Sequence, residues 1–326
     1  MTTARRPRVL LTRRWPEAVE RALAERFELT PNLEDKPLSA AQIAAALLEY
    51  DAVCPTVTDK VDAAALAPNQ PRARILGNFG VGYSHIDVER AKAIGLVVTN
   101  TPDVLSDCTA DLAMTLMLMV ARCAGEGERE LREGRWTGWR PTHLIGTKVT
   151  GATLGIIGFG RIGQEMAARA HFGFGMPILV YNRSPVDPAI LAKTGARQVA
   201  SIEELLRSSD VVSLHFPGGA ANRHLINAER IAMMRPGAFL INTARGEVVD
   251  EEALAAALKA GRIGGAGLDV YSAEPQVIPA LLDAPNAVLL PHLGSATSAT
   301  REAMGFRVMD NLVAFFDGKE PPDRVA

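Results

Sequence analysis

A glycine cluster in the middle of the chain constrains the fold more than any other stretch. Gly158, Gly160 and Gly163 have G-x-G-x-x-G spacing, directly after the apolar run Leu154–Ile157 and at the start of a helical stretch, Arg161 to His171. In this pattern the first glycine permits a tight turn, the second lets a pyrophosphate approach the backbone, and the third lets the helix pack closely on the strand. Because strand, turn and helix follow in the required order, the stretch predicts a dinucleotide site.

The composition indicates a globular protein of about two domains. The chain has 326 residues, 48% of them apolar, and a formal net charge of −2, which gives no general reason to expect nucleic acid or an acidic membrane as partner. Cys54, Cys108 and Cys123 lack metal-ligand spacing, so we expect no metal site and buried thiols in a reducing compartment. Val9–Thr12 is too short for a signal-peptide core and Leu112–Ala121 too short for a membrane span. We therefore expect a cytoplasmic protein.

The first part of the chain alternates strand-like and helical patterns up to about Asn100. The expected strands are Arg8–Thr12, Asp51–Cys54, Ile75–Leu76 and Leu96–Thr99, and the expected helices are Pro16–Arg26, one that begins at Ser39 as N-cap, and Asp87–Ala93. Alternation of this kind predicts a parallel sheet covered by helices. This domain has no phosphate loop of its own.

A second alternation follows the glycine cluster. Its expected strands are Leu154–Ile157, Ile178–Tyr181, Asp210–Phe216, Phe239–Thr243, Ala266–Val270 and Val288–Leu290. The expected helices Asp107–Arg122 and Glu126–Glu133 precede the cluster and lead into this second domain. The helices expected after the cluster are one from Ser201 or Ile202 to Arg207, Ala228–Met234, Asp250–Ala260 and a final helix at Ser298–Phe316. The chain is thus predicted to be an α/β protein with two Rossmann-like or flavodoxin-like parallel-sheet domains.

An irregular arm, Arg135–Gly151, separates the two patterns and carries Trp136 and Trp139. The favoured interpretation is that the two indoles pin the arm onto the core. The alternative is that they project toward a pocket or a partner subunit, as aromatic residues at interfaces do.

Three chemically capable side chains follow three of the expected strands. Arg245 comes after Phe239–Thr243, Glu274 after Ala266–Val270, and His292 after Val288–Leu290, with Asp269 expected to be buried one residue inside its strand. In open α/β sheets, ligands bind beyond the carboxyl ends of the strands, so these side chains and the glycine turn should share one edge.

Each of these side chains also has a purely structural interpretation. Arg245 would pair with a surface acid, Glu274 would be solvated, and His292 would be a loop histidine whose ring nitrogens are hydrogen-bonded within the protein. Their convergence beside a dinucleotide site favours catalysis. An arginine fork can hold a carboxylate, a histidine can deliver a proton at neutral pH, and a neighbouring carboxylate stabilises the imidazolium and fixes its orientation. Hydride transfer to a 2-oxo acid needs these parts and few others.

At these residues the sequence resembles the D-2-hydroxyacid dehydrogenase family over essentially its full length, and it is most similar to the glyoxylate/hydroxypyruvate reductase branch. The motifs that carry the resemblance are GFGRIG at Gly158–Gly163, INTARGEVVDEEAL at Ile241–Leu254, GLDVYSAEP at Gly267–Pro275, and LPHLGSAT at Leu290–Thr297. Ser84, Asp103 and the stretch His215–Gly219 depart from the common family pattern, which leaves details of the substrate pocket and the nicotinamide wall open.

The resemblance implies roles for individual residues. Arg245 would orient the substrate, Glu274 would be the partner of the histidine, and His292 would be the general acid/base. The substrate carboxylate would lie on backbone N–H groups of the loop Asn78–Gly82, so the expected substrate-binding residues are Asn78, Val81, Gly82, Arg245 and His292. The expected cofactor contacts are Thr109, Gly158, Gly160, Arg161, Ile162, Gly163, Asn182, Arg183, Ser184, His215, Phe216, Pro217, Thr243, Ala244, Arg245, Asp269, His292 and Gly294.

The end of the second strand indicates which nicotinamide cofactor to expect. An NAD enzyme places Asp or Glu there for the ribose 2′-OH, and that carboxylate would repel a 2′-phosphate. This chain has Asn182, Arg183 and Ser184 instead, and Arg183 can pair with a phosphate. The alternative is a plain turn before Pro185 with a solvated arginine. The residues favour NADPH, with NADH possible.

These observations predict an NADPH-dependent reductase of small 2-oxo acids, with glyoxylate and hydroxypyruvate as leading substrates. The expected division is a substrate-binding domain at residues 1–100 and 298–326 and a dinucleotide-binding domain at 101–297, with catalysis in the cleft between them. The rivals are a reductase of bulkier 2-oxo acids, such as 2-ketogluconate or hydroxyphenylpyruvate, and a non-catalytic dinucleotide-sensing regulator. The resemblance also implies a homodimer, through the region Asn100–Gly151, and a C-terminal helix that returns to the first domain.

Overall fold

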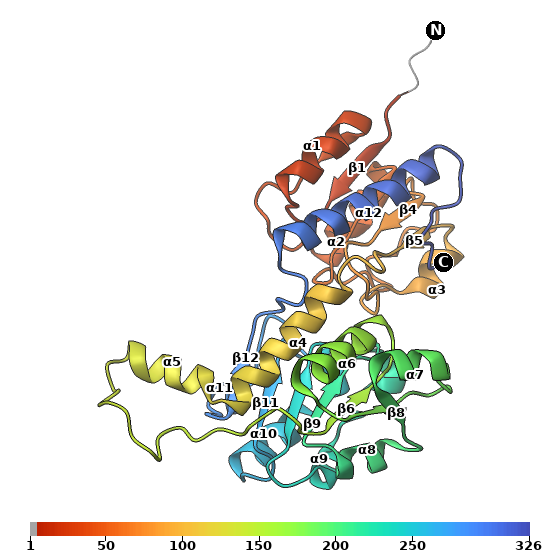
Figure 1. Ribbon diagram of the computed structural model, residues 1–326. Helices are drawn as coiled ribbons and strands as arrows, with labels where there is room; N and C mark the ends of the chain where they lie inside the picture. Colours follow the sequence, from red (N-terminus) through yellow and green to blue (C-terminus); the bar gives the residue numbers. More distant parts are fainter. Residues whose placement is uncertain (1–4) are drawn as a thin grey trace. The chain divides into compact units, whose positions relative to one another are not determined.

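The computed structural model describes residues 5–326, which form two compact units (Figure 1). The first unit extends to Leu105 and includes Ala296–Ala326, and the second is Ser106–Ser295. Each unit is an α/β sandwich around a parallel sheet, as the alternating pattern predicted. Residues 1–4, which belong to the expected first domain, lie outside the described part.

The first unit is built on a five-stranded sheet with the order β2-β1-β3-β4-β5 among the described residues. Every neighbouring pair is parallel. The strands are β1 (Arg8–Leu11), β2 (Glu28–Thr30), β3 (Ala52–Cys54), β4 (Ile75–Gly77) and β5 (Val97–Thr99), and the helices are α1 (Glu17–Arg26), α2 (Ala40–Glu49), α3 (Val88–Ala93) and α12 (Ser298–Phe316). Ser39 caps α2 in a capping box with Gln42, as expected of the N-cap residue.

The C-terminal helix belongs to the first unit. In Figure 1 the blue helix α12 lies beside α1 and the strands of this unit, although about 190 residues of the second unit separate it from them in sequence. Gly305 lets α12 approach α1 closely, because a Cβ there would lie 2.7 Å from Val19. The return of the C-terminal helix, which the resemblance implied, is thus confirmed.

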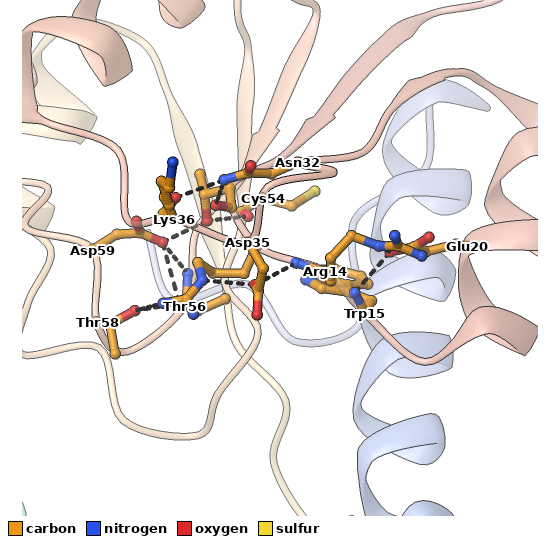
Figure 2. Close-up of polar contacts among 12 residues, drawn as sticks. Arg14, Trp15, Glu20, Asn32, Asp35, Lys36, Cys54, Thr56, Thr58 and Asp59 are labelled. Carbon is orange, nitrogen blue, oxygen red and sulfur yellow. Dashed lines mark hydrogen bonds and ion pairs between the residues drawn. The ribbon is translucent and has the colours of Figure 1, made fainter.

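Polar side chains fix the loops at the carboxyl edge of this first sheet (Figure 2). Asp59, which is 1% exposed, accepts hydrogen bonds from the Thr56 backbone N–H at 2.7 Å and from the Thr12 hydroxyl at 2.5 Å. Asn32 donates to the carbonyl of Thr12, and Asp35 accepts from the backbone N–H of Arg14. The loops after β1, β2 and β3 are therefore held together as one layer.

The second unit is built on a seven-stranded parallel sheet with the order β12-β11-β10-β9-β6-β7-β8. Its strands are β6 (Leu154–Ile157), β7 (Ile178–Tyr181), β8 (Ala196–Gln198), β9 (Val211–Leu214), β10 (Phe239–Asn242), β11 (Gly265–Leu268) and β12 (Ala287–Leu289). The central strands β6, β9, β10 and β11 are buried throughout. Because both faces of the sheet are covered by helices, these strands are predominantly apolar, and their polar residues Ser213 and Asn242 are buried as well.

The helices of this unit are α4 (Ser106–Ala121), α5 (Ala124–Arg132), α6 (Arg161–Phe174), α7 (Pro188–Thr194), α8 (Ile202–Ser208), α9 (Ala228–Met233), α10 (Glu251–Lys259) and α11 (Pro279–Leu282). Two short 3₁₀ turns lie at Ala220–Asn222 and Gly246–Val248. Within the described residues no single helix is both long and apolar enough to cross a membrane. Only α4 and α5 taken together reach that length and hydropathy, and they are bent by 69° at the break between them.

Two expectations from the sequence are wrong. Trp136 and Trp139 do not pin the arm, because their exposed fractions are 50% and 83%. Cys54 is a buried thiol, but Cys108 and Cys123 are only half-buried, since each lies near an end of the amphipathic helix α4 rather than on its buried face. The sequence also gave no sign of the edge strands β2 and β8 or of the short helices α7 and α11.

Candidate active site

The glycine turn between β6 and α6 has the geometry that its spacing predicts. Gly158 has φ +88°, and a Cβ there would lie 2.5 Å from the carbonyl oxygen of His215 on the loop after β9. A Cβ on Gly163 would lie 2.5 Å from the carbonyl oxygen of Gly158, so the third glycine allows the helix to close onto the turn. At Gly160 the Cβ position is open to space, which leaves the backbone approachable there.

A cavity of about 440 Å³ lies beside this turn, within the second unit. Its walls come from the loops after β6, β7 and β9, all at the carboxyl edge of the sheet. The lining includes the expected cofactor residues Gly158, Gly160, Asn182, Arg183, His215, Phe216 and Pro217. Arg161 and Ile162 form the first turn of α6, whose N-terminus points its unpaired N–H groups toward the glycine turn. The donor set suits a nucleotide with phosphate groups.

The segment after β7 presents an arginine and no acid. The Asn182 side chain is used internally, since its Oδ1 accepts from the Phe159 N–H at 3.3 Å and its Nδ2 donates to the Ser184 carbonyl at 3.1 Å. Gln198 on β8 donates to the Asn182 and Ser184 carbonyls and steadies the same turn. Arg183 is exposed and has no hydrogen-bond or ion-pair partner among residues 5–326. Its guanidinium is therefore available to an anion.

His292 and Glu274 form a hydrogen-bonded pair at the other side of the same edge. The His292 Nδ1 atom lies 2.8 Å from Glu274 Oε2, and both side chains are about one-quarter exposed. Glu274 Oε1 accepts from the Tyr271 N–H at 3.0 Å, which fixes the carboxylate. Burial alone would raise the pKa of Glu274, but the hydrogen bond and charge of His292 lower it below the usual value. The pairing at Nδ1 leaves Nε2 as the atom that can exchange a proton with a ligand.

Asp269 holds the backbone that carries His292. Its carboxylate, 1% exposed, accepts from the Leu293 N–H at 2.6 Å and from the Gly294 N–H at 2.8 Å. The Thr109 hydroxyl of α4 donates to the Gly294 carbonyl at 3.0 Å. His292 itself has φ +58°, a conformation that a non-glycine residue adopts only when its surroundings impose it. Burial raises the pKa of Asp269, and its backbone donors and the charge of His292 oppose that rise.

Arg245, the third predicted catalytic residue, follows β10. Its side chain is half-buried, and one Nη atom donates to the Ala244 carbonyl at 2.6 Å. Desolvation lowers the pKa of its guanidinium, and the charges of Glu247 and Glu274 oppose that effect. No carboxylate of residues 5–326 lies within 4.0 Å of it. A partly desolvated cation without a paired anion is suited to bind an incoming carboxylate.

Two other predicted cofactor residues carry polar groups in this edge. The hydroxyl of Thr243, which is 8% exposed, has no hydrogen-bond partner within the described part of the chain. His215 Nε2 lies 2.8 Å from the Ser213 hydroxyl, and burial lowers the pKa of this imidazole to about 4. His215 is therefore neutral near pH 7 and unsuited to supply a proton.

The predicted carboxylate loop lies in the first unit, after β4. Asn78 is fully buried and its side chain is occupied within the loop, whereas Val81 and Gly82 are partly exposed. The backbone N–H groups of Val81 and Gly82 have no acceptor among residues 5–326. The structure thus leaves the two predicted amide donors unpaired, whereas the Asn78 side-chain amide already donates to the Gly80 and Gly82 carbonyls.

The second unit also matches a known family in sequence. Residues 114–294 match the model described as "D-isomer specific 2-hydroxyacid dehydrogenase, NAD binding domain". The chain belongs to this family. The match covers more than half of the chain and includes the glycine turn, Arg245, Glu274 and His292. It identifies the protein as a nicotinamide-dependent 2-hydroxyacid dehydrogenase, so the cavity beside the glycine turn has the location expected for the dinucleotide.

Full-length relatives agree with this family. The chain is 44% identical over 324 residues to a glyoxylate reductase of Thermococcus litoralis, with 98% of this chain and 97% of the relative covered. It is similar to the crystal structure of an NADPH-dependent glyoxylate/hydroxypyruvate reductase of Sinorhizobium meliloti in complex with NADP and malonate, with TM-score 0.87, 37% identity and coverage of 98% and 97%. It is also similar to a D-mandelate dehydrogenase of Rhodotorula graminis, with TM-score 0.86, 30% identity and coverage of 99% and 98%.

Sequence reasoning missed three residues that shape these sites. Gln198 supports the turn after β7, and His85 and Asn100 contact the carboxylate loop. Asp269 was expected near the cofactor, but its observed contacts are with the backbone after His292. The contacts of Gln198, Asn100 and Asp269 join segments that are separate along the chain, and the contact of His85 with Asn78 depends on how the loop between them turns, so none has a clear sequence signal.

Proposed function

We propose that the chain is an NADPH-dependent reductase that converts small 2-oxo acids, glyoxylate and hydroxypyruvate first among them, to D-2-hydroxy acids. The observation that carries the proposal is the His292–Glu274 pair at 2.8 Å on the same sheet edge as the unpaired Arg245 and the glycine turn. A proton donor, a carboxylate-binding cation and a dinucleotide site are the parts that this reduction requires.

His292 is the proposed proton donor to the substrate carbonyl oxygen, through Nε2. Glu274 stabilises the positive charge on the ring while the proton is held there, and it keeps Nε2 free by binding Nδ1. Arg245 and the backbone N–H groups of Val81 and Gly82 are the proposed partners of the substrate carboxylate. The nicotinamide, when bound, supplies the hydride that adds to substrate C2.

The test of this proposal is His292→Gln, measured by NADPH oxidation with glyoxylate. General acid catalysis contributes roughly 10²- to 10⁴-fold, so turnover should fall by about that factor while NADPH still binds. Near-normal turnover would refute the proton-donor role. If wild-type protein binds NADPH but reduces no 2-oxo acid in a substrate panel, the regulator is favoured over the enzyme.

The preference for NADPH rests on Arg183. Its exposed side chain has no partner among residues 5–326, and no acid stands at 181–184 to accept a ribose 2′-OH. Arg183→Ala should raise the KM for NADPH much more than the KM for NADH. Arg207→Ala removes an exposed arginine from α8 and is the matched control. Equal effects of the first change on both cofactors would contradict the assignment.

A reductase of bulkier 2-oxo acids is the second candidate. It is favoured by the similarity to the D-mandelate dehydrogenase of Rhodotorula graminis, whose named substrate carries an aromatic ring. The ratio of kcat/KM for glyoxylate, hydroxypyruvate, 2-ketogluconate, hydroxyphenylpyruvate and phenylglyoxylate decides between the two. A ratio that favours the last three would replace the proposed substrate class without changing the roles of the catalytic residues.

We also propose that the protein is a homodimer through the region Asn100–Gly151. Four large apolar side chains of this region are exposed in the single chain, namely Leu131, Trp136, Trp139 and Ile145, with exposed fractions of 61%, 50%, 83% and 71%. Apolar area of this kind is typical of a protein interface. Sedimentation of the wild type and of Trp139→Glu should give a dimer and a weakened dimer, respectively.

A further inference from the structure

Three successive carbonyl groups of the loop after β4, those of Gly80, Val81 and Gly82, accept hydrogen bonds from donors within the first unit. Thr101 donates its backbone N–H to the Gly80 carbonyl at 3.1 Å, in addition to the bond from the Asn78 side chain at 2.9 Å. The side-chain amides of two asparagines hold the next two carbonyls: Asn100 Nδ2 donates to Val81 at 2.8 Å, and Asn78 Nδ2 donates to Gly82 at 3.1 Å.

This arrangement leaves donors without acceptors. The N–H groups of Val81 and Gly82 have no partner among residues 5–326, and both residues are only partly exposed. Successive backbone N–H groups with their carbonyls turned away form a concave site for an anion. If the carbonyls rotated outward, their negative ends would face the anion and repel it. The orientation of the loop is therefore as important for carboxylate binding as its presence.

Asn78 controls this orientation, and His85 controls Asn78. Asn78 binds the carbonyl oxygens of Gly80 and Gly82, which can only accept hydrogen bonds, so the donor atom Nδ2 must face them. The acceptor atom Oδ1 must then face the ring of His85, 3.0 Å away. His85 must then donate from Nε2. Because Asn78 is completely buried and its amide is bonded at both ends, its side chain cannot bind a substrate directly.

We propose that Asn78, His85 and Asn100 are positioning residues that set the Val81 and Gly82 N–H groups for the substrate carboxylate. This inference rests on the proposed function, since it assigns how the proposed carboxylate site is held. It replaces the direct substrate contact expected for Asn78. His85 acts through Asn78, and Asn100 acts independently on the Val81 carbonyl.

The test compares His85→Gln with His85→Leu in the full-length protein. Glutamine keeps a neutral donor near the position of Nε2, whereas leucine leaves the Asn78 Oδ1 atom without its partner. One neutral hydrogen bond corresponds to roughly a 2- to 12-fold change in an equilibrium constant. We expect the leucine variant to raise the glyoxylate KM and the inhibition constant of oxamate by that factor, with a smaller change in kcat. The glutamine variant should stay near wild type.

Asn100→Ala supplies a second, independent variant, and Asn69→Ala is its control. Asn69 is exposed and lies in the same unit, and its only hydrogen-bond partner among residues 5–326 is Arg90, at 2.7 Å. The first change should raise the glyoxylate KM and the oxamate inhibition constant by a similar 2- to 12-fold, and the second should leave both unchanged. Thermal melting and the KM for NADPH should stay close to wild type in every variant.

The proposal is overturned if His85→Leu and Asn100→Ala both keep the wild-type oxamate inhibition constant. It is also overturned if the KM for NADPH rises in parallel with that for glyoxylate, which would indicate a general loss of structure. Failure of the proposed function looks different, because wild-type protein would then reduce no 2-oxo acid at all. If His85→Leu does not fold, the pair Asn100→Ala and Asn69→Ala still decides the question.

Discussion

Glu274→Gln isolates the charge that supports the proposed proton donor. The wild-type carboxylate accepts two hydrogen bonds, from His292 Nδ1 at 2.8 Å and from the Tyr271 N–H at 3.0 Å. Glutamine has one acceptor oxygen, so one of these two donors must face an N–H group. The substitution is nearly isosteric, and it removes both the negative charge beside the imidazole and one acceptor.

The size of the effect follows from these two bonds. A hydrogen bond to a charged group contributes about 1.5–3 kcal/mol, and each 1.4 kcal/mol corresponds to a factor of ten. We therefore expect kcat/KM for the reduction to fall roughly 10- to 150-fold near pH 7.

The assay is the initial rate of NADPH oxidation with glyoxylate from pH 5 to pH 9. Glu252→Gln is the matched control, because Glu252 lies exposed on α10 and should change neither the rate nor the profile. The loss should persist down to pH 5, because the pKa of Glu274 lies below its usual value and the wild-type carboxylate stays charged there. A Glu274→Gln protein with near-wild-type kcat/KM across this pH range would contradict the role given to the Glu274 charge.

Three further outcomes are expected. Asp269→Asn leaves one acceptor for two backbone N–H groups, so kcat should fall on the order of tenfold in the same assay. Gly246→Ala should destabilise the fold by roughly 1–3 kcal/mol or more in urea unfolding, because the added Cβ would meet the Tyr271 backbone. Gly173→Ala is the control on α6: its Cβ would enter open space, so this change should stabilise the fold by about 0.5–1 kcal/mol. Burial lowers the pKa of His215 to about 4, so the unfolded protein binds a proton at this residue more tightly than the folded protein does. The free energy of unfolding of the wild type should therefore fall by up to roughly 3 kcal/mol between pH 6.5 and pH 4. Urea titrations at the two pH values should show a smaller loss for His215→Gln.

The elements with strong local patterns could be read from the sequence. The bounds of β6, β7 and α12 are as predicted, because buried apolar runs and a long amphipathic helix leave clear signals. The edge strands β2 and β8 were missed since each has three residues, and none of the six is buried. Helix α7 begins with Pro188 at its first turn, a position that proline tolerates but that also reads as a loop.

The candidate site was predictable to the level of residue type and strand end, but not to the level of contacts. Parallel strands bring their carboxyl ends to one edge, so the order of Arg245, Glu274 and His292 along the chain was enough to group them. The bonds from Asp269 to Leu293 and Gly294 span about 25 residues and depend on the left-handed backbone of His292, which no local pattern signals. Trp139 was misread because an apolar residue in an arm does not reveal whether its own chain covers it.

The two carboxylates beside His292 have different tasks because they meet different donors. Glu274 faces the imidazole ring, so its charge is supported and the pKa of its carboxyl is lowered despite burial. Asp269 faces backbone N–H groups and is more deeply buried, so desolvation dominates and its pKa is raised. One acid therefore acts on the charge of the histidine and the other on its position. This division explains why Glu274→Gln should act by removing a charge beside the ring, whereas Asp269→Asn should act by loosening the backbone that carries the ring.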